Sequence, residues 1–159
     1  MYCRFSFSGV CQRGRKSIVW QFEHSAKSAA AKESVWRRYV DVANWREWSV
    51  EGVEWSRLDG PFEVGTTGKS KPPGRLPAGS FRVDAVVPNE LYRSETKLPG
   101  VRLMFEHIIE PADEGVTVTH RAILDGPLAR LWVPVLRKSI ERGLPSGVDR
   151  LAAMAATDP

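Results

Sequence analysis

The chain has 159 residues, of which 42% are hydrophobic and 26% charged, a composition typical of one folded domain and not of a disordered chain. No apolar run approaches the roughly 20 residues that a membrane-spanning helix needs. The N-terminus also lacks the cleavage site of a secretory signal, so we expect a cytoplasmic protein without a membrane span. The net charge of +4 admits nucleic acid or an anionic membrane as partner, but the basic residues are spread along the chain. That distribution favours a solvated surface, and a nucleic-acid partner is not favoured.

The first elements expected along the chain are a strand and a short helix. Apolar or aromatic residues alternate with polar ones from Ile18 through Trp20 and Phe22 to His24, which is the period of a half-buried strand. Ser28 is a plausible helix cap. The helix that follows carries one apolar face at helical spacing. That face consists of Val35, Trp36, Tyr39 and Val40.

Three of the six tryptophans fall within residues 44–55. Trp45 and Trp48 are three residues apart in a short helical turn, so they are expected on one side of it, with Trp48 the better candidate to reach the open end of the sheet. Trp55 shares its parity with Val53 in the next strand, which indicates core or cavity wall. Simple packing of all three rings is the competing interpretation, because buried indoles contribute large apolar area and need only one partner for the N–H.

Residues 51–126 contain short β-rich runs separated by turn sequences such as DGP, PPG, PNE, LPG and PADEG, the pattern of an antiparallel meander. In three runs the apolar residues share one parity, which predicts one covered face for each strand. These sets are Phe81, Val83, Ala85 and Val87; Leu103, Phe105, His107 and Ile109; and Val116, Val118, His120, Ala122 and Leu124. Arg82, Asp84, Glu106, Glu110, Thr117, Thr119 and Arg121 occupy the opposite faces, which are expected to be wet.

A further run would add hydroxyl groups to the covered face. Tyr92, Ser94, Thr96 and Leu98 share a parity, and pairing of this strand with the one over 81–87 would turn them inward. A mostly apolar cavity with a few convergent polar groups is typical of a small-molecule site. Strand propensity alone is an equally good explanation for these residue types.

The last part of the chain has helical periodicity. Its apolar stripe comprises Leu128, Leu131, Trp132, Val135, Leu136, Ile140, Leu144, Val148, Leu151 and Ala155. Pro134 and Pro145 lie within it, and each is expected to begin or kink a helical piece, because proline lacks a backbone donor and clashes with the preceding turn. A sheet with one covered face and one long helix to cover it is an α+β arrangement.

The order of several spaced segments resembles the polyketide cyclase/dehydrase and lipid-transport superfamily, the START-like (SRPBCC) helix-grip class that includes the birch-allergen fold. The segments are VWRRYVDVANWREW, LDGPFEVGTTGK, LPGVRLMFEHIIEP, GVTVTH, DGPLARL and LPSGVDRLAAMA, and the resemblance covers about residues 17–156. It implies a curved, seven-stranded antiparallel sheet around a long C-terminal helix, with two short helices between the first two strands and an apolar cavity inside. We expect a single ligand-binding domain over 16–157, with residues 1–15 as an N-terminal extension for which disorder is one option.

His107 and His120 are the candidates for chemistry. The turn between their strands allows the two residues to face each other across the pair, both pointing into the cavity. Such a pair could act as general acid and base in a ring closure or dehydration. No carboxylate shares the covered faces, so a metal site lacks its third ligand, and Cys3 and Cys11 have no partners for a zinc site. Half-buried histidines satisfied by water or backbone are the preferred alternative.

The resemblance leaves the function open, because fold alone does not decide it. We favour binding, or transport, of a hydrophobic or aromatic small molecule, without a cofactor. A cyclase/dehydratase that uses a cavity histidine is the first alternative, and an RNA- or ribosome-associated module is the second. The residues expected to contact the ligand are Trp36, Trp48, Trp55, Phe81, Val83, Tyr92, Ser94, Thr96, Phe105, Val118, Trp132, Leu136 and Ile140.

Overall fold

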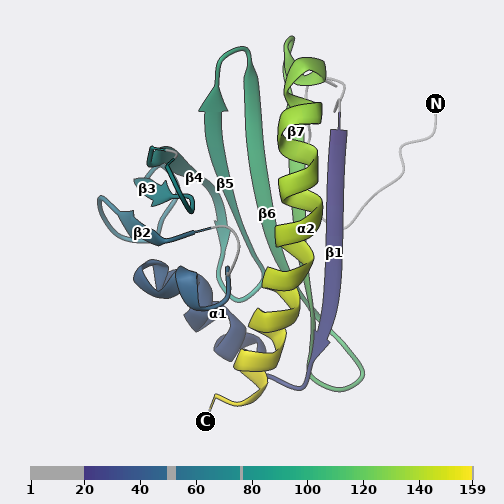
Figure 1. Ribbon diagram of the computed structural model, residues 1–159. Helices are drawn as coiled ribbons and strands as arrows, with labels where there is room; N and C mark the ends of the chain where they lie inside the picture. Colours follow the sequence, from purple (N-terminus) through teal and green to yellow (C-terminus); the bar gives the residue numbers. More distant parts are fainter. Residues whose placement is uncertain (1–19, 50–52, 76, 159) are drawn as a thin grey trace, which may run out of the picture.

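A seven-stranded antiparallel sheet and one long helix make up most of the computed structural model, which describes residues 20–49, 53–75 and 77–158 (Figure 1). The strands lie in the order β1-β7-β6-β5-β4-β3-β2. Their bounds are Trp20–Ser28 (β1), Trp55–Leu58 (β2), Thr67–Lys71 (β3), Gly79–Val87 (β4), Leu91–Leu98 (β5), Val101–Pro111 (β6) and Val116–Asp125 (β7). The helices are α1 (Lys32–Val40), the 3-10 helix η1 (Val42–Glu47) and α2 (Ala129–Ala156).

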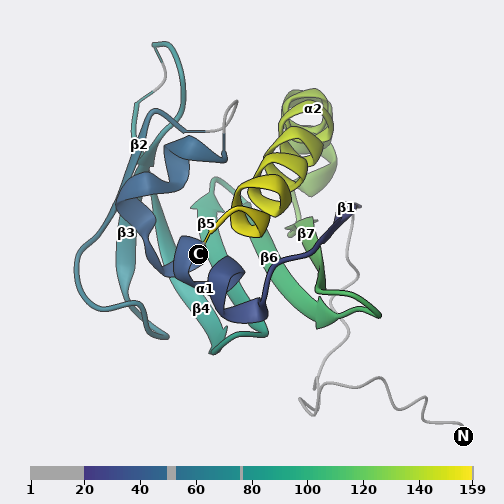
Figure 2. The same ribbon diagram turned by 90° about the horizontal axis from the view of Figure 1, so that it is seen from below.

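The sheet curves around α2, which crosses its concave side (Figure 2). Helices α1 and η1 stand between β1 and β2 in sequence and close one end of the molecule (Figure 1). This α+β helix-grip arrangement, with seven strands and two short helices between the first two, confirms the predicted fold. The expectations for residues 1–15 and for Ile18 lie outside the described residues.

Ser28 does not cap a helix, contrary to the sequence-based expectation. It is the last residue of β1, and α1 begins at Lys32 with Ala31 in the cap position. The buried Ser28 hydroxyl donates to the Ala152 carbonyl at 2.7 Å and accepts from the Ala30 amide at 3.2 Å. A short polar side chain is favoured at this position because it joins the end of β1 to α2.

Both prolines of the C-terminal segment lie inside one helix of 28 residues, so neither begins a new helical piece, which is one of the two outcomes expected for them. Each proline removes one bond to the carbonyl four residues earlier, and those carbonyls belong to Arg130 and Glu141, neither of which is buried. Water can therefore hydrogen-bond the freed oxygens. Packing of Val148 and Leu151 against the sheet holds the C-terminal half in place.

The predicted apolar stripe of α2 faces the protein over only part of its length. Val148, Leu151 and Ala155 are buried, whereas Leu131 and Val135 are 69% and 66% exposed. The inward prediction is therefore wrong for these two residues and for Leu128, which is 43% exposed. The reason is geometric, since the helix begins at the end of the sheet, beside the β5–β6 turn (Figure 1).

The structure also corrects the predicted facing of Ala85 and Val87 in β4 and of Thr119 in β7. A bulge between Val83 and Ala85 puts Val86, instead of Ala85, opposite Tyr92; Val86 packs on the core, and Val87 is 43% exposed. An extra residue in a bulge reverses the facing of everything after it, which periodicity alone does not reveal. Thr119, expected on a wet face, is buried and bonds Ser25 at 2.7 Å between the hydroxyl oxygens.

Apolar packing divides into two clusters beneath α2. The larger one joins α1 and η1 to the sheet and to the C-terminal half of α2, and includes Tyr39, Trp45, Trp48, Tyr92 and Leu151. The smaller one lies at the other end of the helix. It consists of Val101, Leu124 and Ala129, with Trp20, Leu98, Leu103, Trp132, Val133 and Leu136 packed on it.

The bond from Ser28 to α2 can be tested by substitution. We expect Ser28→Ala to lower the free energy of unfolding by about 1–2 kcal/mol, because it leaves the buried Ala30 amide and Ala152 carbonyl without that partner. Ser146→Ala is the matched control, since this exposed serine bonds only within its own helix. Equal urea unfolding curves for the two variants would contradict the assignment.

Candidate ligand-binding site

Four ring-bearing side chains form one row across the sheet. The strand register pairs His24 with His120, His120 with His107, and His107 with Tyr92. The predicted pairing of His107 with His120 is confirmed, with ring centroids 4.3 Å apart. The Tyr92 and His107 rings are stacked at 3.9 Å. His107 and His120 are buried, and His24 at the edge meets Asp149 of α2 at 2.9 Å.

Tyr39 of α1 covers this row from the side opposite the sheet. Its hydroxyl lies 2.9 Å from His120 Nε2, and its fully buried ring contacts Tyr92 at 5.0 Å and His107 at 5.4 Å. The sequence indicates Tyr39 only as part of the inner face of a helix, so its role in the cluster is not predicted. Its contact with His120 depends on how the connection after β1 places α1 over the sheet, and no local pattern encodes that placement.

Trp45 and Trp48 of the 3-10 segment complete the cluster. Both are buried, their ring centroids are 6.1 Å apart, and the shared side expected for them is confirmed. Trp45 donates from Nε1 to the Tyr39 carbonyl at 2.9 Å and stacks near Phe81 at 5.6 Å. Trp48 lies 5.6 Å from the His120 ring, so it reaches the sheet as predicted.

Trp55 does not belong to this group. It is 40% exposed, and Ser56 is the buried residue of β2. The prediction that Trp55 lies in the core or cavity wall is therefore wrong. Strand β2 begins at Trp55, and the side chain that faces inward is that of Ser56. The Ser56 hydroxyl is hydrogen-bonded to the Ser70 hydroxyl, with 2.7 Å between the oxygens.

Two nitrogen atoms of the cluster are buried without a partner in the described part of the chain. They are Nε1 of Trp48 and Nδ1 of His107, whose rings lie 6.4 Å apart between centroids. A buried polar atom without a hydrogen bond costs free energy, and such atoms in native structures require an explanation. Because indole Nε1 can only donate, its missing partner is an acceptor.

Burial keeps the ionisable groups of the cluster uncharged. It lowers the pKa of His107 well below its ordinary value, and the nearby His120 lowers it further. Burial, with a smaller effect of His24, lowers the pKa of His120 to about 3. The pKa values of the Tyr39 and Tyr92 hydroxyls are raised by burial. At neutral pH the cluster is therefore an uncharged, aromatic surface with a few polar atoms.

The other predicted contact residues are divided between the ends and the middle of the concave face. Trp36, Phe81, Val83 and Val118 belong to the larger cluster, and Trp132 and Leu136 to the smaller one. Ser94 is buried, and its partners on the neighbouring strands are Val83 of β4 and Phe105 of β6. Thr96, Phe105 and Ile140 are half-buried and belong to neither cluster.

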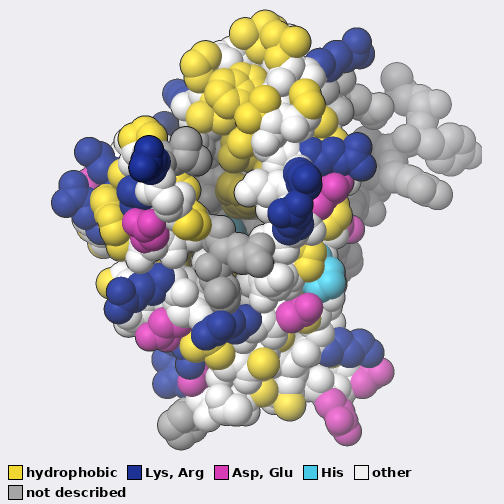
Figure 3. Space-filling view, in the orientation of Figure 1, with side chains coloured by type: hydrophobic (Ala, Val, Ile, Leu, Met, Phe, Trp, Pro, Cys, Tyr) yellow, Lys and Arg dark blue, Asp and Glu magenta, His cyan; other side chains and the backbone are white. Residues whose placement is uncertain are grey.

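Phe105 marks open space between the two clusters. It lies in β6, between β5 and β7, and shares its facing with the buried His107 and Ile109, yet its own side chain stays partly exposed. A residue at this place would be covered if α2 packed tightly along its whole length. The space-filling view shows a hollow between α2 and the β2–β3 side of the molecule (Figure 3).

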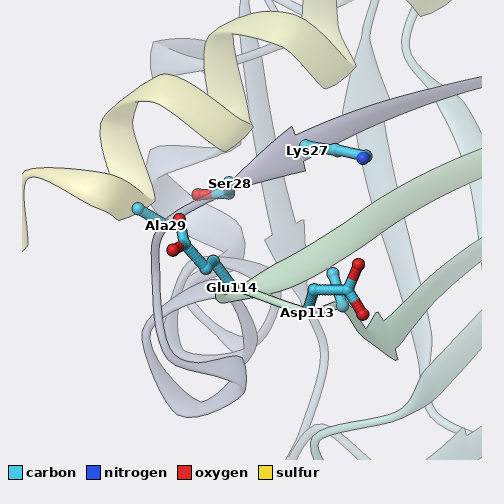
Figure 4. A pocket seen from close by; sticks show the side chains of 6 residues that line it. Lys27, Ser28, Ala29, Asp113 and Glu114 are labelled. Carbon is cyan, nitrogen blue, oxygen red and sulfur yellow. The ribbon is translucent and has the colours of Figure 1, made fainter.

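A separate pocket of about 420 Å³ lies at the end of β1 and the β6–β7 turn (Figure 4). Its lining is Lys27, Ser28, Ala29, Ala112, Asp113 and Glu114. None of the residues predicted to contact a ligand lines it. It is open and lined in part by charged side chains, unlike the aromatic cluster. Its carboxylates do not assemble a metal site, since no group of three metal-ligating side chains occurs within the described ranges.

Among the described residues, no helix has the length and apolarity to cross a membrane.

The sequence matches a family model described as polyketide cyclase/dehydrase and lipid transport over residues 19–156. No match was found among curated proteins.

Two of the similar solved structures are a norcoclaurine synthase and an aromatase/cyclase by their names. Norcoclaurine synthase from Thalictrum flavum, in complex with dopamine and hydroxybenzaldehyde, has a TM-score of 0.69 and 16% identity, covering 97% of this chain and 98% of that one. The Zhui aromatase/cyclase from Streptomyces sp. R1128 has a TM-score of 0.69 and 15% identity, covering 86% and 93%. At these identities the likeness establishes the fold.

The uncharged histidines give a pH test. In the unfolded chain they have their ordinary pKa near 6.5, so between pH 7.5 and 5 the unfolded state takes up protons that the folded state does not. Stability is therefore complete above about pH 6.5 and falls as the pH drops toward 3. We expect the free energy of unfolding to fall by up to about 2 kcal/mol per buried histidine between pH 7.5 and 5.

Urea unfolding at several pH values measures this slope. The double variant His107→Gln/His120→Gln should flatten it, and the half-exposed His24→Gln control should retain it. A double variant as pH-dependent as the wild type would show that the buried pair does not titrate in this way.

Proposed function

This chain belongs to the polyketide cyclase/dehydrase and lipid transport family, and we propose that it binds an uncharged aromatic or hydrophobic small molecule between the sheet and α2. The observation that carries the proposal is the open middle of the concave face. Phe105 is half-buried there. The larger, aromatic cluster lies on one side of it, and the smaller cluster, which includes Trp132 and is called the Trp132 cluster below, lies on the other. Apolar walls with a few polar groups are the usual lining of a small-molecule site.

The unpaired nitrogens at the aromatic end support a ligand that carries oxygen. A hydroxyl or carbonyl oxygen would accept from Trp48 Nε1, and a hydroxyl would in addition satisfy His107 Nδ1 in either tautomer. Both nitrogens are covered by neighbouring atoms of the protein. Binding is therefore expected to include a small displacement of the Trp48 ring from its place against His107.

The electrostatics of the cluster favour a neutral ligand over an anion. The ring neighbours of Tyr39, His107 and His120 are aromatic or histidine rings, and burial keeps the histidines uncharged. A carboxylate placed there would be desolvated without a cation to pair it, which costs several kcal/mol. A phenol or aryl ketone meets no such penalty.

Binding without catalysis is favoured over the cyclase/dehydratase alternative. The Nε2 atom of His120 is already engaged with the Tyr39 hydroxyl. With pKa values depressed by burial, neither histidine is an imidazolium near pH 7, the form that would act as a general acid. The RNA alternative is disfavoured because Arg38, Arg93, Arg102 and Arg121, spread over the molecule, are engaged with carboxylates.

A matched pair of compounds tests the proposal. We expect isothermal titration to show 2-naphthol binding at least about tenfold more tightly than 2-naphthoate, a difference of about 1.4 kcal/mol. The two share the fused aromatic ring and differ in charge near pH 7. Equal affinity, or tighter binding of the carboxylate, would contradict the proposed selection against an anion.

The indole donor can be tested separately. Trp48→Phe keeps a ring in the cluster but removes the N–H, so naphthol affinity should fall by about 5- to 15-fold, the equivalent of one hydrogen bond of about 1–1.5 kcal/mol. Trp55→Phe, at an exposed position outside the cluster, is the control and should bind as the wild type does. If the two variants bind alike, Trp48 is a packing residue only.

A further inference from the structure

The N-terminal half of α2 carries an apolar surface that nothing in the described chain covers. Leu128, Leu131 and Val135 follow each other at three- and four-residue steps and are 43%, 69% and 66% exposed. Hydrophobic side chains gather over this end of the helix in the space-filling view (Figure 3). We call Leu128, Leu131, Trp132 and Val135 the apolar platform.

The apolar platform is held rigidly on the sheet. The Leu128 amide donates to the Gly100 carbonyl at 3.0 Å, and Trp132 donates from Nε1 to the Pro99 carbonyl at 3.0 Å. Gly100 has a positive φ of 68°, and a Cβ there would lie 2.5 Å from Leu128 side-chain atoms. The β5–β6 turn therefore fits closely under the first turn of the helix and fixes its orientation.

Basic residues are exposed on the same half of α2 as the apolar platform. They are Arg130, Arg137, Lys138 and Arg142. The one acidic residue between 129 and 142, Glu141, is paired with Arg137 at 2.7 Å. This combination of exposed leucine and valine, a half-exposed tryptophan and an excess of positive charge is the composition of a helix that lies on an anionic membrane surface.

We propose that this end of α2 docks the protein on an anionic lipid bilayer. Leu131 and Val135 would enter the headgroup region, and the basic side chains would contact lipid phosphates. So few apolar side chains give only weak adhesion alone, so docking depends on the anionic lipid as well. A second copy of the chain fits this face poorly, because a symmetric contact would bring both sets of basic residues together.

Docking at this end would also have a consequence for the ligand. The apolar platform lies at the same end of the molecule as the Trp132 cluster, and its hydrophobic side chains continue toward the hollow between α2 and the β2–β3 side (Figure 3). This orientation would turn the hollow toward the bilayer. An apolar ligand could then pass between lipid and protein with little exposure to water.

Vesicle sedimentation of the full chain tests the docking. We expect binding to phosphatidylcholine vesicles that contain phosphatidylglycerol, little binding to phosphatidylcholine alone, and release as salt is raised. Leu131→Ser/Val135→Ser should lower the bound fraction at least about fivefold, and Arg137→Gln/Lys138→Gln should lower it on anionic vesicles. The control Val64→Ser/Val87→Ser alters exposed valines elsewhere, 57% and 43% exposed, and should bind as the wild type does.

Three results would overturn the proposal. The first is equal binding of Leu131→Ser/Val135→Ser and the control. The second is a fall in the urea midpoint of Leu131→Ser/Val135→Ser well beyond that of Leu131→Gln/Val135→Gln, because side chains already in water contribute to folding only through helix propensity, and a larger fall would mean that another part of the chain covers them. The third is a dimer in equilibrium sedimentation that the same variant dissociates. None of these depends on naphthol binding, so failure of membrane docking and failure of the proposed ligand site are distinguishable.

Discussion

The structure depends on the burial of two neutral histidines in the middle of a sheet. His107 and His120 face each other on adjacent strands, where two protonated rings would repel each other and lose their hydration. Tyr39 covers the pair, and its hydroxyl lies 2.9 Å from His120. That contact places α1 against the sheet, and the bond from Trp45 Nε1 to the Tyr39 carbonyl then places the 3-10 segment. One end of the concave face is thereby closed by aromatic rings without a net charge.

The long helix accounts for both proposed properties, because its two halves have different environments. Its C-terminal half packs on the aromatic cluster through Val148 and Leu151. Farther toward its N-terminus Ile140 is only partly buried, as is Phe105 of the sheet, and the proposed ligand would lie there. The first turns rest on the β5–β6 hairpin and present Leu131 and Val135 to solvent. A single helix thus forms a wall of the proposed binding site and the proposed membrane contact.

Much of this arrangement follows from local patterns, and its departures have identifiable physical causes. Alternation over the last strands, with the short turn between them, allows the pairing of His107 with His120, since a one-residue shift would expose every apolar side chain. The bulge after Val83 and the start of β2 at Trp55 depend on neighbouring strands, so parity alone misplaced Val87 and Trp55. The partnership of Tyr39 with His120 joins residues 81 positions apart. Helical periodicity identified the stripe of α2 but contains no information about how far the sheet extends beneath it.

Nitrogen-15 NMR of the histidine rings, with 2-naphthol added, measures the central property most directly. The account predicts that His107 and His120 retain the shifts of neutral imidazole down to pH 5, and that the ring-nitrogen signals of His107 move when naphthol binds while those of His24 do not. Protonation of His107 or His120 near pH 6.5, or binding of naphthol without any change at His107, would contradict a neutral aromatic site that supplies polar partners to its ligand.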